Sequence, residues 1–234
     1  MSAQTDRFVL DHLPPREQWP QMRYDLPELQ LPVQLNAAEE LLDKAVTKGF
    51  GDRPLLRSPN VTFTYAQARE RVDRIAQVLT EDLGLVPGNR VLLRGGNSVG
   101  MALAWLAVVK AGLVAVATMP LLRARELGDI IEKSQPVAAI CDAKLLGELE
   151  QAQKDHPALK TILRYNAPND PQDLGALCAA KPGNFAPCPT AADDIALMAF
   201  TSGTTGKPKA AVHSHRDVMA ACETWPRHVL KATP

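Results

Sequence analysis

The sequence has no excess of charge of either sign, because 26 lysine and arginine residues are balanced by 26 aspartate and glutamate residues. A protein that binds nucleic acid or an anionic membrane surface over a wide area usually carries a net positive field. The balance argues against both kinds of partner. Any site for an anion must therefore be local, and no nucleic-acid partner is expected.

Cysteine is also scarce, and the four residues are far apart: Cys141, Cys178, Cys188 and Cys222. They form no C-x-x-C pair and no paired pattern with histidine. A disulfide framework or a zinc site is therefore not predicted, and no metal ligand is assigned. Reduced thiols in a cytoplasmic protein are the default interpretation.

Signals for secretion and for membrane insertion are missing as well. The N-terminal stretch M-S-A-Q-T-D-R-F-V-L-D has no apolar core, so secretion is not indicated. Residues 99–122 form a long apolar run, but Lys110 and Gly112 have the pattern of a helix C-terminus. The L-V-A-V-A that follows is typical of a buried strand. We predict a buried helix and then a strand, with no membrane span.

Between residues 90 and 164, short apolar runs alternate with helical patterns. Strands are predicted at 90–94, 113–117, 137–141 and 161–164, and helices at about 99–110, 124–134 and 144–154. This alternation predicts an α/β fold with a mostly parallel sheet flanked by helices. Such sheets bind ligands beyond the carboxyl ends of their strands.

The segments on either side of this region are less regular. Residues 1–35 are rich in proline and are predicted to form an extended arm. Residues 36–64 are predicted to hold a helix that opens at Asn36 and two short strands, and a second helix follows from Tyr65. Residues 167–190 contain five prolines, and they form either a domain boundary or a surface crossing within one domain.

The stretch 193–215 is predicted to form strand, loop and strand. Its loop reads T-S-G-T-T-G-K-P-K. The loop contains glycines that allow positive φ, hydroxyl donors and cations, namely Gly203, Gly206, Thr201, Ser202, Thr204, Thr205, Lys207 and Lys209. Successive N–H groups in such a turn form an anion site, and the natural ligand is a polyphosphate.

Two familiar nucleotide motifs do not fit. The loop is not a Walker motif, because Thr201 stands where the first glycine is needed and Pro208 follows Lys207. The glycines near residue 95 do not satisfy G-x-G-x-x-G in any register.

Charged residues around the loop receive modest roles. Asp193 and Asp194 are interpreted as solvated turn residues and not as a metal-binding pair, because neighbours on a strand point to opposite faces. His213 and His215 alternate on the outgoing strand. A metal site and a supporting role beside the loop both remain open for them, and the supporting role is favoured. A helix from residue 216 to 230 is predicted to break at Pro226.

The nine-residue loop resembles the phosphate-binding signature of the adenylate-forming superfamily, which contains acyl- and aryl-CoA synthetases. Further stretches resemble early blocks of acyl-CoA synthetases: F-T-Y at 63–65, G-L-V-P-G-N-R-V at 84–91, A-W-L-A-V-V-K-A-G at 104–112 and A-R-E-L at 124–127. The arm and the run K-P-K-A-A-V-H-S-H-R-D-V are most similar to 2-aminobenzoate- and benzoate-CoA ligases. One departure is Ala210, where the family commonly has glycine.

The resemblance implies a two-step reaction. A carboxylate attacks the α-phosphate of ATP and releases pyrophosphate, and the thiol of CoA then displaces AMP to give a thioester. Residues 201–206 are implied to wrap the β- and γ-phosphates, while Lys207 and Lys209 offset their charge. Mg²⁺ is implied as a bridge between the phosphates.

The resemblance also implies that much of the site lies elsewhere, because family members are more than twice as long. The adenine, ribose and acid sites and the C-terminal domain with its catalytic lysine are expected beyond Pro234, so no catalytic residue is assigned. We expect an N-terminal fragment of an acid–CoA ligase for an aromatic acid. Residues 36–234 are then an incomplete AMP-binding domain. A peptide-synthetase adenylation module and a non-catalytic nucleotide-binding domain are the alternatives.

Overall fold

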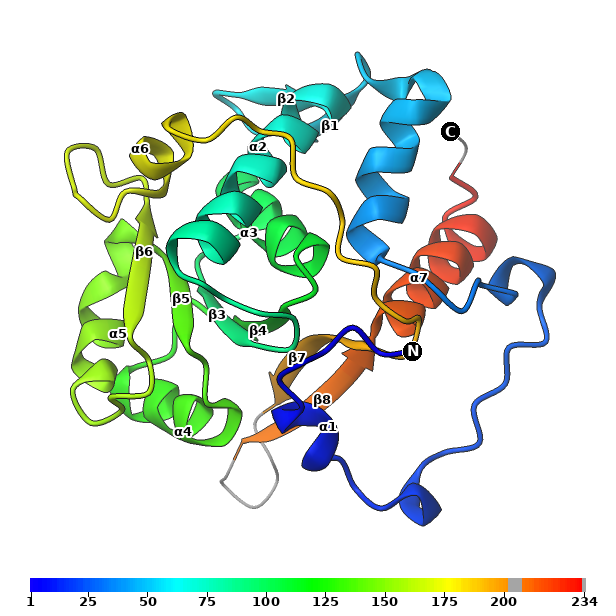
Figure 1. Cartoon of the computed structure of the whole chain (residues 1–234), viewed down its shortest axis with the longest axis horizontal. Coiled ribbons are helices and arrows are strands. Elements are labelled where there is room, and N and C mark those ends of the chain that lie inside the picture. Colours follow the sequence, from blue (N-terminus) through cyan, green and yellow to red (C-terminus); the bar gives the residue numbers. More distant parts are fainter. Residues whose placement is uncertain (202–207, 233–234) are drawn as a thin grey trace.

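The computed structural model describes residues 1–201 and 208–232. Within these residues, the centre of the fold is a six-stranded sheet in the order β6-β5-β3-β4-β7-β8 (Figure 1). Its strands are β3 (Arg90–Arg94), β4 (Val114–Thr118), β5 (Ala138–Asp142), β6 (Thr161–Tyr165), β7 (Ile195–Thr201) and β8 (Lys209–Ser214). Neighbouring strands are parallel, except that β7 and β8 form an antiparallel hairpin. The predicted α/β fold is confirmed.

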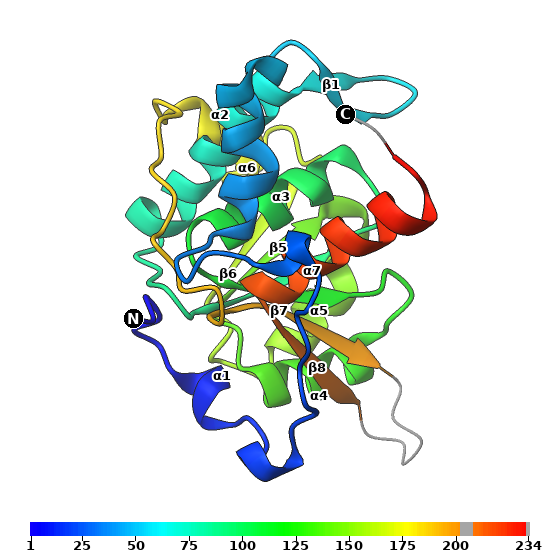
Figure 2. The same ribbon diagram turned by 90° about the vertical axis from the view of Figure 1, so that its right-hand side faces the viewer.

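Helices cover both faces of this sheet. The crossovers are α3 (Val99–Lys110), α4 (Ala124–Ser134) and α5 (Leu146–Gln153). The step from β3 to β4 runs in one direction along the sheet and the step from β4 to β5 in the other. Right-handed crossovers therefore place α3 on one face and α4 with α5 on the opposite face. Figure 2 shows α2 (Tyr65–Gln77) and α3 on one side of the sheet and α1 (Phe8–Asp11) and α4 on the other.

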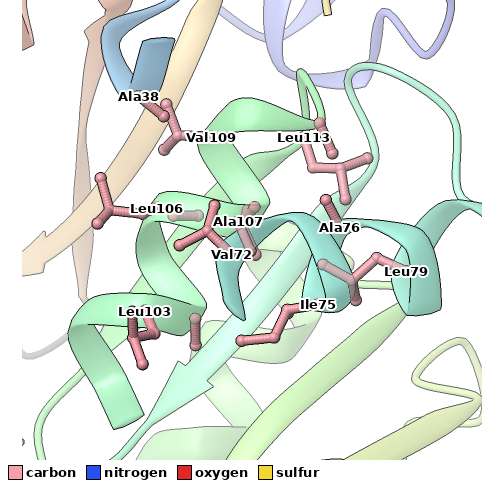
Figure 3. Close-up of a cluster of buried hydrophobic side chains, with 14 of the residues drawn as sticks. Ala38, Val72, Ile75, Ala76, Leu79, Leu103, Leu106, Ala107, Val109 and Leu113 are labelled. Carbon is pink, nitrogen blue, oxygen red and sulfur yellow. The ribbon is translucent and has the colours of Figure 1, made fainter. Parts of the chain in front are cut away.

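The apolar core is divided by the sheet in the same way. Along β3, Val91 and Leu93 face the α2–α3 side, while Leu92 faces the α4–α5 side. Between α2 and α3, side chains such as Val72, Ile75 and Leu103 are buried against one another (Figure 3). Each fully buried side chain of this size contributes about 1.5–3 kcal/mol.

The apolar run 99–122 is the helix and strand that the sequence predicts, α3 and β4. In the described part of the chain, no helix is long and apolar enough to cross a membrane.

Polar side chains define where the helices begin. The Asn36 side chain accepts hydrogen bonds from the backbone N–H groups of Ala38 and Glu39, at 3.1 and 3.3 Å. It thereby caps a helical segment that includes the π-helical turns η3 (Glu39–Asp43) and η4 (Val46–Phe50). Ser98 caps α3, and Thr64 forms a capping box at the start of α2. These caps satisfy N–H groups that the helices leave unpaired.

A buried ammonium group connects three of the helices. Lys110, at the end of α3, is fully buried, and its Nζ lies 2.6 Å from Asp43 Oδ1 and 2.5 Å from Asp73 Oδ1. Two carboxylates thus share one cation, and burial raises the pKa of Asp73 despite its bond to Lys110. Because a buried charge without a partner is costly, the cluster holds η3, α2 and α3 in one arrangement.

Three segments outside the sheet refine the prediction. The strands β1 (Pro54–Arg57) and β2 (Thr62–Thr64) pair as predicted. The arm contains the short helix α1 and the 3-10 turns η1 (Arg16–Gln18) and η2 (Pro27–Leu29). The crossing predicted as irregular holds the helix α6 (Leu174–Ala179), whose N-terminus is capped by Asp173. A six-residue helix is too short to show helical periodicity, and burial of Leu174 and Cys178 stabilises it.

All four cysteines are free thiols. Burial raises the pKa of Cys141 to about 12 and the pKa values of Cys178 and Cys188 to about 11. The pKa of Cys222 is also raised by burial. The thiols are therefore protonated at neutral pH.

The turn between α3 and β4 depends on Gly112, and we expect Gly112→Ala to destabilise the chain by about 2–4 kcal/mol. Gly112 has φ +73°, and an added Cβ would lie 2.6 Å from Cys188 Sγ. The matched control is Gly147→Ala in α5, where no atom lies within 4 Å of the added Cβ. We expect this change to alter stability by no more than about 1 kcal/mol. Urea unfolding measures both, and equal effects would contradict the prediction.

Candidate nucleotide-binding hairpin

The β7–β8 hairpin carries the loop that the sequence singles out. β7 lies parallel to β4, with Ala199 opposite Ala117, so its last residue, Thr201, is on the carboxyl side of the sheet. Thr201 pairs with Lys209, the first residue of β8. The ladder therefore brings the two ends of the loop together at the side of the sheet where α/β proteins bind ligands.

Six of the predicted phosphate contacts lie outside the described residues: Ser202, Gly203, Thr204, Thr205, Gly206 and Lys207. The other two, Thr201 and Lys209, are both exposed and face each other across the ladder. A hydroxyl donor and an ammonium group are thus available to a ligand at the mouth of the hairpin. The phosphate contacts themselves stay a prediction.

A further cation lies near the loop and was missed by the sequence reasoning. Lys133, near the end of α4, donates from Nζ to the backbone oxygen of Pro208 at 3.1 Å. No motif marks this lysine, because its position depends on how α4 lies relative to the hairpin.

The opposite end of the hairpin contradicts one prediction. We define residues 190–195 as the hairpin base. Asp193 is exposed and pairs with Arg216 at 2.8 Å, as expected for a solvated residue. Asp194, in contrast, is only 2% exposed, and its Oδ2 accepts hydrogen bonds from the N–H groups of Ala3 and Ala191 at 2.8 and 3.0 Å. The interpretation of Asp194 as solvated was wrong, since protein donors replace water around it.

One of the two histidines, His215, also differs from the prediction. β8 ends at Ser214, whose side chain caps α7 (His215–Thr224), so only His213 lies on the strand. His215 lies at the hairpin base, away from Thr201 and Lys209, and its backbone N–H donates to the backbone oxygen of Asp194 at 3.0 Å. A role for His215 beside the loop is therefore wrong.

The capping box of Ser214 with Asp217 is the sequence signal that was overlooked. It shows that the helix begins at His215, one residue earlier than predicted. After Thr224, α7 gives way to the π-helical turn η7 (Trp225–Val229), which contains Pro226. The break or kink predicted at Pro226 is thus a change from α-helical to π-helical turns, and the helical path continues to Val229.

His215 is a buried, neutral imidazole. Its Nδ1 accepts a hydrogen bond from the Ala37 N–H at 3.0 Å, so the proton must be on Nε2. Nε2 is buried and has no partner among the described residues. Burial lowers the pKa of His215 to about 4. The ring therefore joins the start of the first long helical segment to the hairpin base without carrying a charge.

Acid should weaken the fold through His215. Its pKa in the folded chain lies below the ordinary value of 6.5, so the unfolded chain binds this proton more tightly. The free energy of unfolding should therefore fall as the pH decreases from 7 to 4, by up to about 3 kcal/mol from this residue. Urea unfolding at several pH values measures this loss.

The variant His215→Asn keeps a possible acceptor near the position of Nδ1 but cannot titrate. We expect it to be less stable at pH 7 and to lose less stability on acidification. His12→Asn, at an exposed histidine, is the control and should keep the wild-type pH profile. A wild-type profile in the His215→Asn chain would refute this role.

A separate cavity of about 560 Å³ opens near the carboxyl ends of β3 and β4. Arg94 forms part of its wall and is 1% exposed. Its guanidinium group donates to four backbone oxygens, those of Leu145, Met119, Pro120 and Leu122, at 2.8–3.3 Å. Arg94 thereby fixes the loop between β4 and α4. Arg123 and Lys144 are also in the lining, against the single carboxylate of Glu148, so positive charge predominates.

The fold and the sequence define the class of this protein. Residues 42–234 match the AMP-binding enzyme family. The chain belongs to the AMP-binding enzyme family.

Relatives in this family include aromatic acid–CoA ligases. The chain is 30% identical over 195 residues to a 4-hydroxybenzoate–CoA/benzoate–CoA ligase of Rhodopseudomonas palustris, covering 83% of this chain and 36% of that protein. It is 28% identical over 204 residues to a benzoate–CoA ligase of Thauera aromatica, covering 87% and 38%. The chain thus spans little more than a third of the length of these relatives.

Solved structures show the same fold. The anthranilate CoA ligase AuaEII in complex with anthranoyl-AMP matches with a TM-score of 0.75 at 22% identity, over 82% of this chain and 36% of that one. ATP-bound MatB from Rhodopseudomonas palustris matches with a TM-score of 0.69 at 26% identity, over 83% and 38%.

Proposed function

We propose that this chain supplies the ATP-phosphate-binding part of an AMP-forming carboxylic acid–CoA ligase. The observation that carries the proposal is the β7–β8 hairpin, which closes the T-S-G-T-T-G-K-P-K loop between Thr201 and Lys209 on the carboxyl side of the sheet. Loop N–H groups, hydroxyls and lysines are the donors that a triphosphate requires. Membership of the AMP-binding family supports the same assignment.

In this proposal the hairpin holds the β- and γ-phosphates while the acid carboxylate attacks the α-phosphorus. The bond from the α-phosphorus to the bridging oxygen breaks, and pyrophosphate leaves. The CoA thiol then attacks the acyl carbon, and AMP leaves as the thioester forms. The hairpin residues contribute by positioning the phosphates and by offsetting their charge.

Mg²⁺ would enter with the nucleotide in this proposal. The described residues contain no group of three or more acidic, histidine or cysteine side chains that could hold a metal. Mg²⁺ at nucleotide sites is bound largely by phosphate oxygens and water. We therefore assign no residue of the chain to the metal.

The proposed acid is aromatic, with benzoate and 2-aminobenzoate as first candidates. The benzoate–CoA ligases of Rhodopseudomonas palustris and Thauera aromatica support benzoate. The anthranilate ligase supports an α/β fold of the same kind. We place the reaction in the cytoplasm, where ATP and CoA are present. Contacts to adenine, ribose and the acid are not assigned to residues of this chain.

The proposed domain organisation follows from the same functional assignment. Residues 1–35 form the N-terminal arm, and residues 36–234 belong to the large AMP-binding domain. The segment 167–190 is then a crossing inside that domain, with α6 within it.

Titration with ATP and Mg²⁺ tests the phosphate role directly. We expect Lys209→Ala and Thr204→Ala each to weaken binding by about 10- to 100-fold, because each change removes a donor to an ionised phosphate. The control is Lys160→Ala, at an exposed lysine just before β6. Unchanged affinity in the first two variants would remove the hairpin from the nucleotide site.

A second function is favoured by one relative. A salicyl-AMP ligase/salicyl-S-ArCP synthetase of Mycobacterium tuberculosis is 31% identical over 188 residues, covering 78% of this chain and 32% of that protein. The name of this relative indicates adenylation followed by transfer to a carrier protein. An adenylation module of this type would form the acyl-adenylate without making a CoA thioester.

Assays of pyrophosphate release and thioester formation, made on the longest protein that the gene encodes, distinguish the two functions. A CoA ligase should release pyrophosphate only with a suitable acid, and it should form a thioester from free CoA. Benzoate, hydroxybenzoates and 2-aminobenzoate form the first panel, with long-chain fatty acids as the contrast. Adenylate formation without thioester across the panel would favour the carrier-dependent function.

A further inference from the structure

The hairpin base is held by residues that lie outside the segment matching the family. That segment begins at residue 42. The contacts described below come from residues 3–6 on one side of the hairpin base and from residues 33–37 on the other. Figure 1 shows the dark blue N-terminal segment passing beside the start of β7.

Within the arm, Gln4 bonds directly to β7. Its side chain is buried, with 6% of the residue exposed. Nε2 donates to the Ile195 oxygen at 2.7 Å, and the Ile195 N–H donates to Oε1 at 3.3 Å. A carboxamide presents a donor and an acceptor side by side, as a peptide group does. Gln4 therefore takes the place of a neighbouring strand at the first residue of β7.

The segment around Gln4 is itself fixed to the sheet. The N–H groups of Thr5 and Asp6 donate to the Pro87 oxygen at 3.1 and 3.0 Å. The Asp6 carboxylate pairs with Arg90, the first residue of β3, and accepts from Asn89 Nδ2 at 2.7 Å. Residues 4–6 thus connect the start of β7, through Gln4, with the start of β3, through Asp6, and β3 is two strands away in the sheet.

The other side of the hairpin base is bound by the end of the arm. The Leu35 N–H donates to the Thr190 oxygen at 2.9 Å, and Thr190 Oγ1 donates to the Leu35 oxygen at 2.8 Å. The Ala192 N–H donates to the Val33 oxygen at 2.8 Å. The hairpin base is therefore enclosed by two parts of the arm.

These contacts matter because β8 is an edge strand in the described sheet. The ladder to β4 involves only Leu197, Met198 and Ala199. The direction of the hairpin consequently depends on its base as well as on this short ladder, the Lys133 contact and the apolar packing against α4. A rotation at Ile195 would move Thr201 and Lys209 at the other end, and small displacements of a binding group weaken its contacts strongly.

We propose that Gln4 is a positioning residue of the nucleotide site, which fixes the direction of the β7–β8 hairpin and hence the place of Thr201 and Lys209 at its other end. The proposal rests on the proposed role of the hairpin in binding ATP. It assigns the arm a function in that site, although the arm lies outside the family match and contacts the hairpin at the end opposite the loop.

The test compares Gln4→Ala with Gln30→Ala. Gln30 is an exposed glutamine of the same arm, and its side chain bonds only within the arm, to the Tyr24 oxygen at 2.6 Å. Backbone hydrogen exchange is measured for β7 and β8, with β5 and β6 as the internal reference. In Gln4→Ala we expect about tenfold faster exchange in the hairpin and unchanged exchange in the reference strands. Tenfold corresponds to about 1.4 kcal/mol, which lies within the range expected for losing the two hydrogen bonds between Gln4 and Ile195.

ATP–Mg²⁺ titration of the same variants gives the functional readout. We expect the dissociation constant to rise about tenfold in Gln4→Ala and to stay at the wild-type value in Gln30→Ala. Unchanged exchange in the hairpin, or an equal increase in all strands, would overturn the positioning role. A wild-type chain that does not bind ATP would instead overturn the proposed function, whereas the exchange comparison still decides whether Gln4 holds the hairpin.

Discussion

The hydrogen bonds of the hairpin base are the contacts on which the arrangement of the remaining parts depends. Residues 190–195 bond to the arm on both sides, and Asp194 and Ala192 accept from the first backbone N–H groups of α7. A buried polar group that loses its partner costs about 1–3 kcal/mol. Several such groups would lose their hydrogen-bond partners together if the base moved. The arm, the hairpin and α7 are therefore held as one unit.

A different principle holds the face of the sheet that carries α2 and α3. There the helices meet through small and branched apolar side chains, and one ion cluster at Lys110 fixes their relative positions. Apolar contacts tolerate sliding, whereas a buried ammonium group between two carboxylates permits few geometries. The apolar contacts and the ion cluster contribute in different ways. Apolar burial supplies most of the stability, and polar contacts select one arrangement.

The sheet could be predicted well from the sequence because local patterns of residues determine its strands and helices. The strand at Arg90–Arg94 and the helix from Ala124 to Ser134 depend on local periodicity and on the residues at their ends. Asp194 and His215 could not be placed in the same way, because their partners are Ala3 and Ala37, which are remote in the sequence. Burial of a polar residue is decided by donors that a local pattern does not contain.

The buried thiols of Cys141 and Cys178 can also be used to measure local opening of the chain. The thiolate is the reactive form, and with pKa values of about 11 to 12 for Cys141, Cys178 and Cys188, fewer than about one thiol in a thousand is ionised near pH 7. Of these, Cys141 and Cys178 are buried and lie in β5 and in α6. Alkylation at each would therefore report how often that part of the chain opens to solvent. The chain thus contains separate reporters of opening for its sheet and for the segment 167–190.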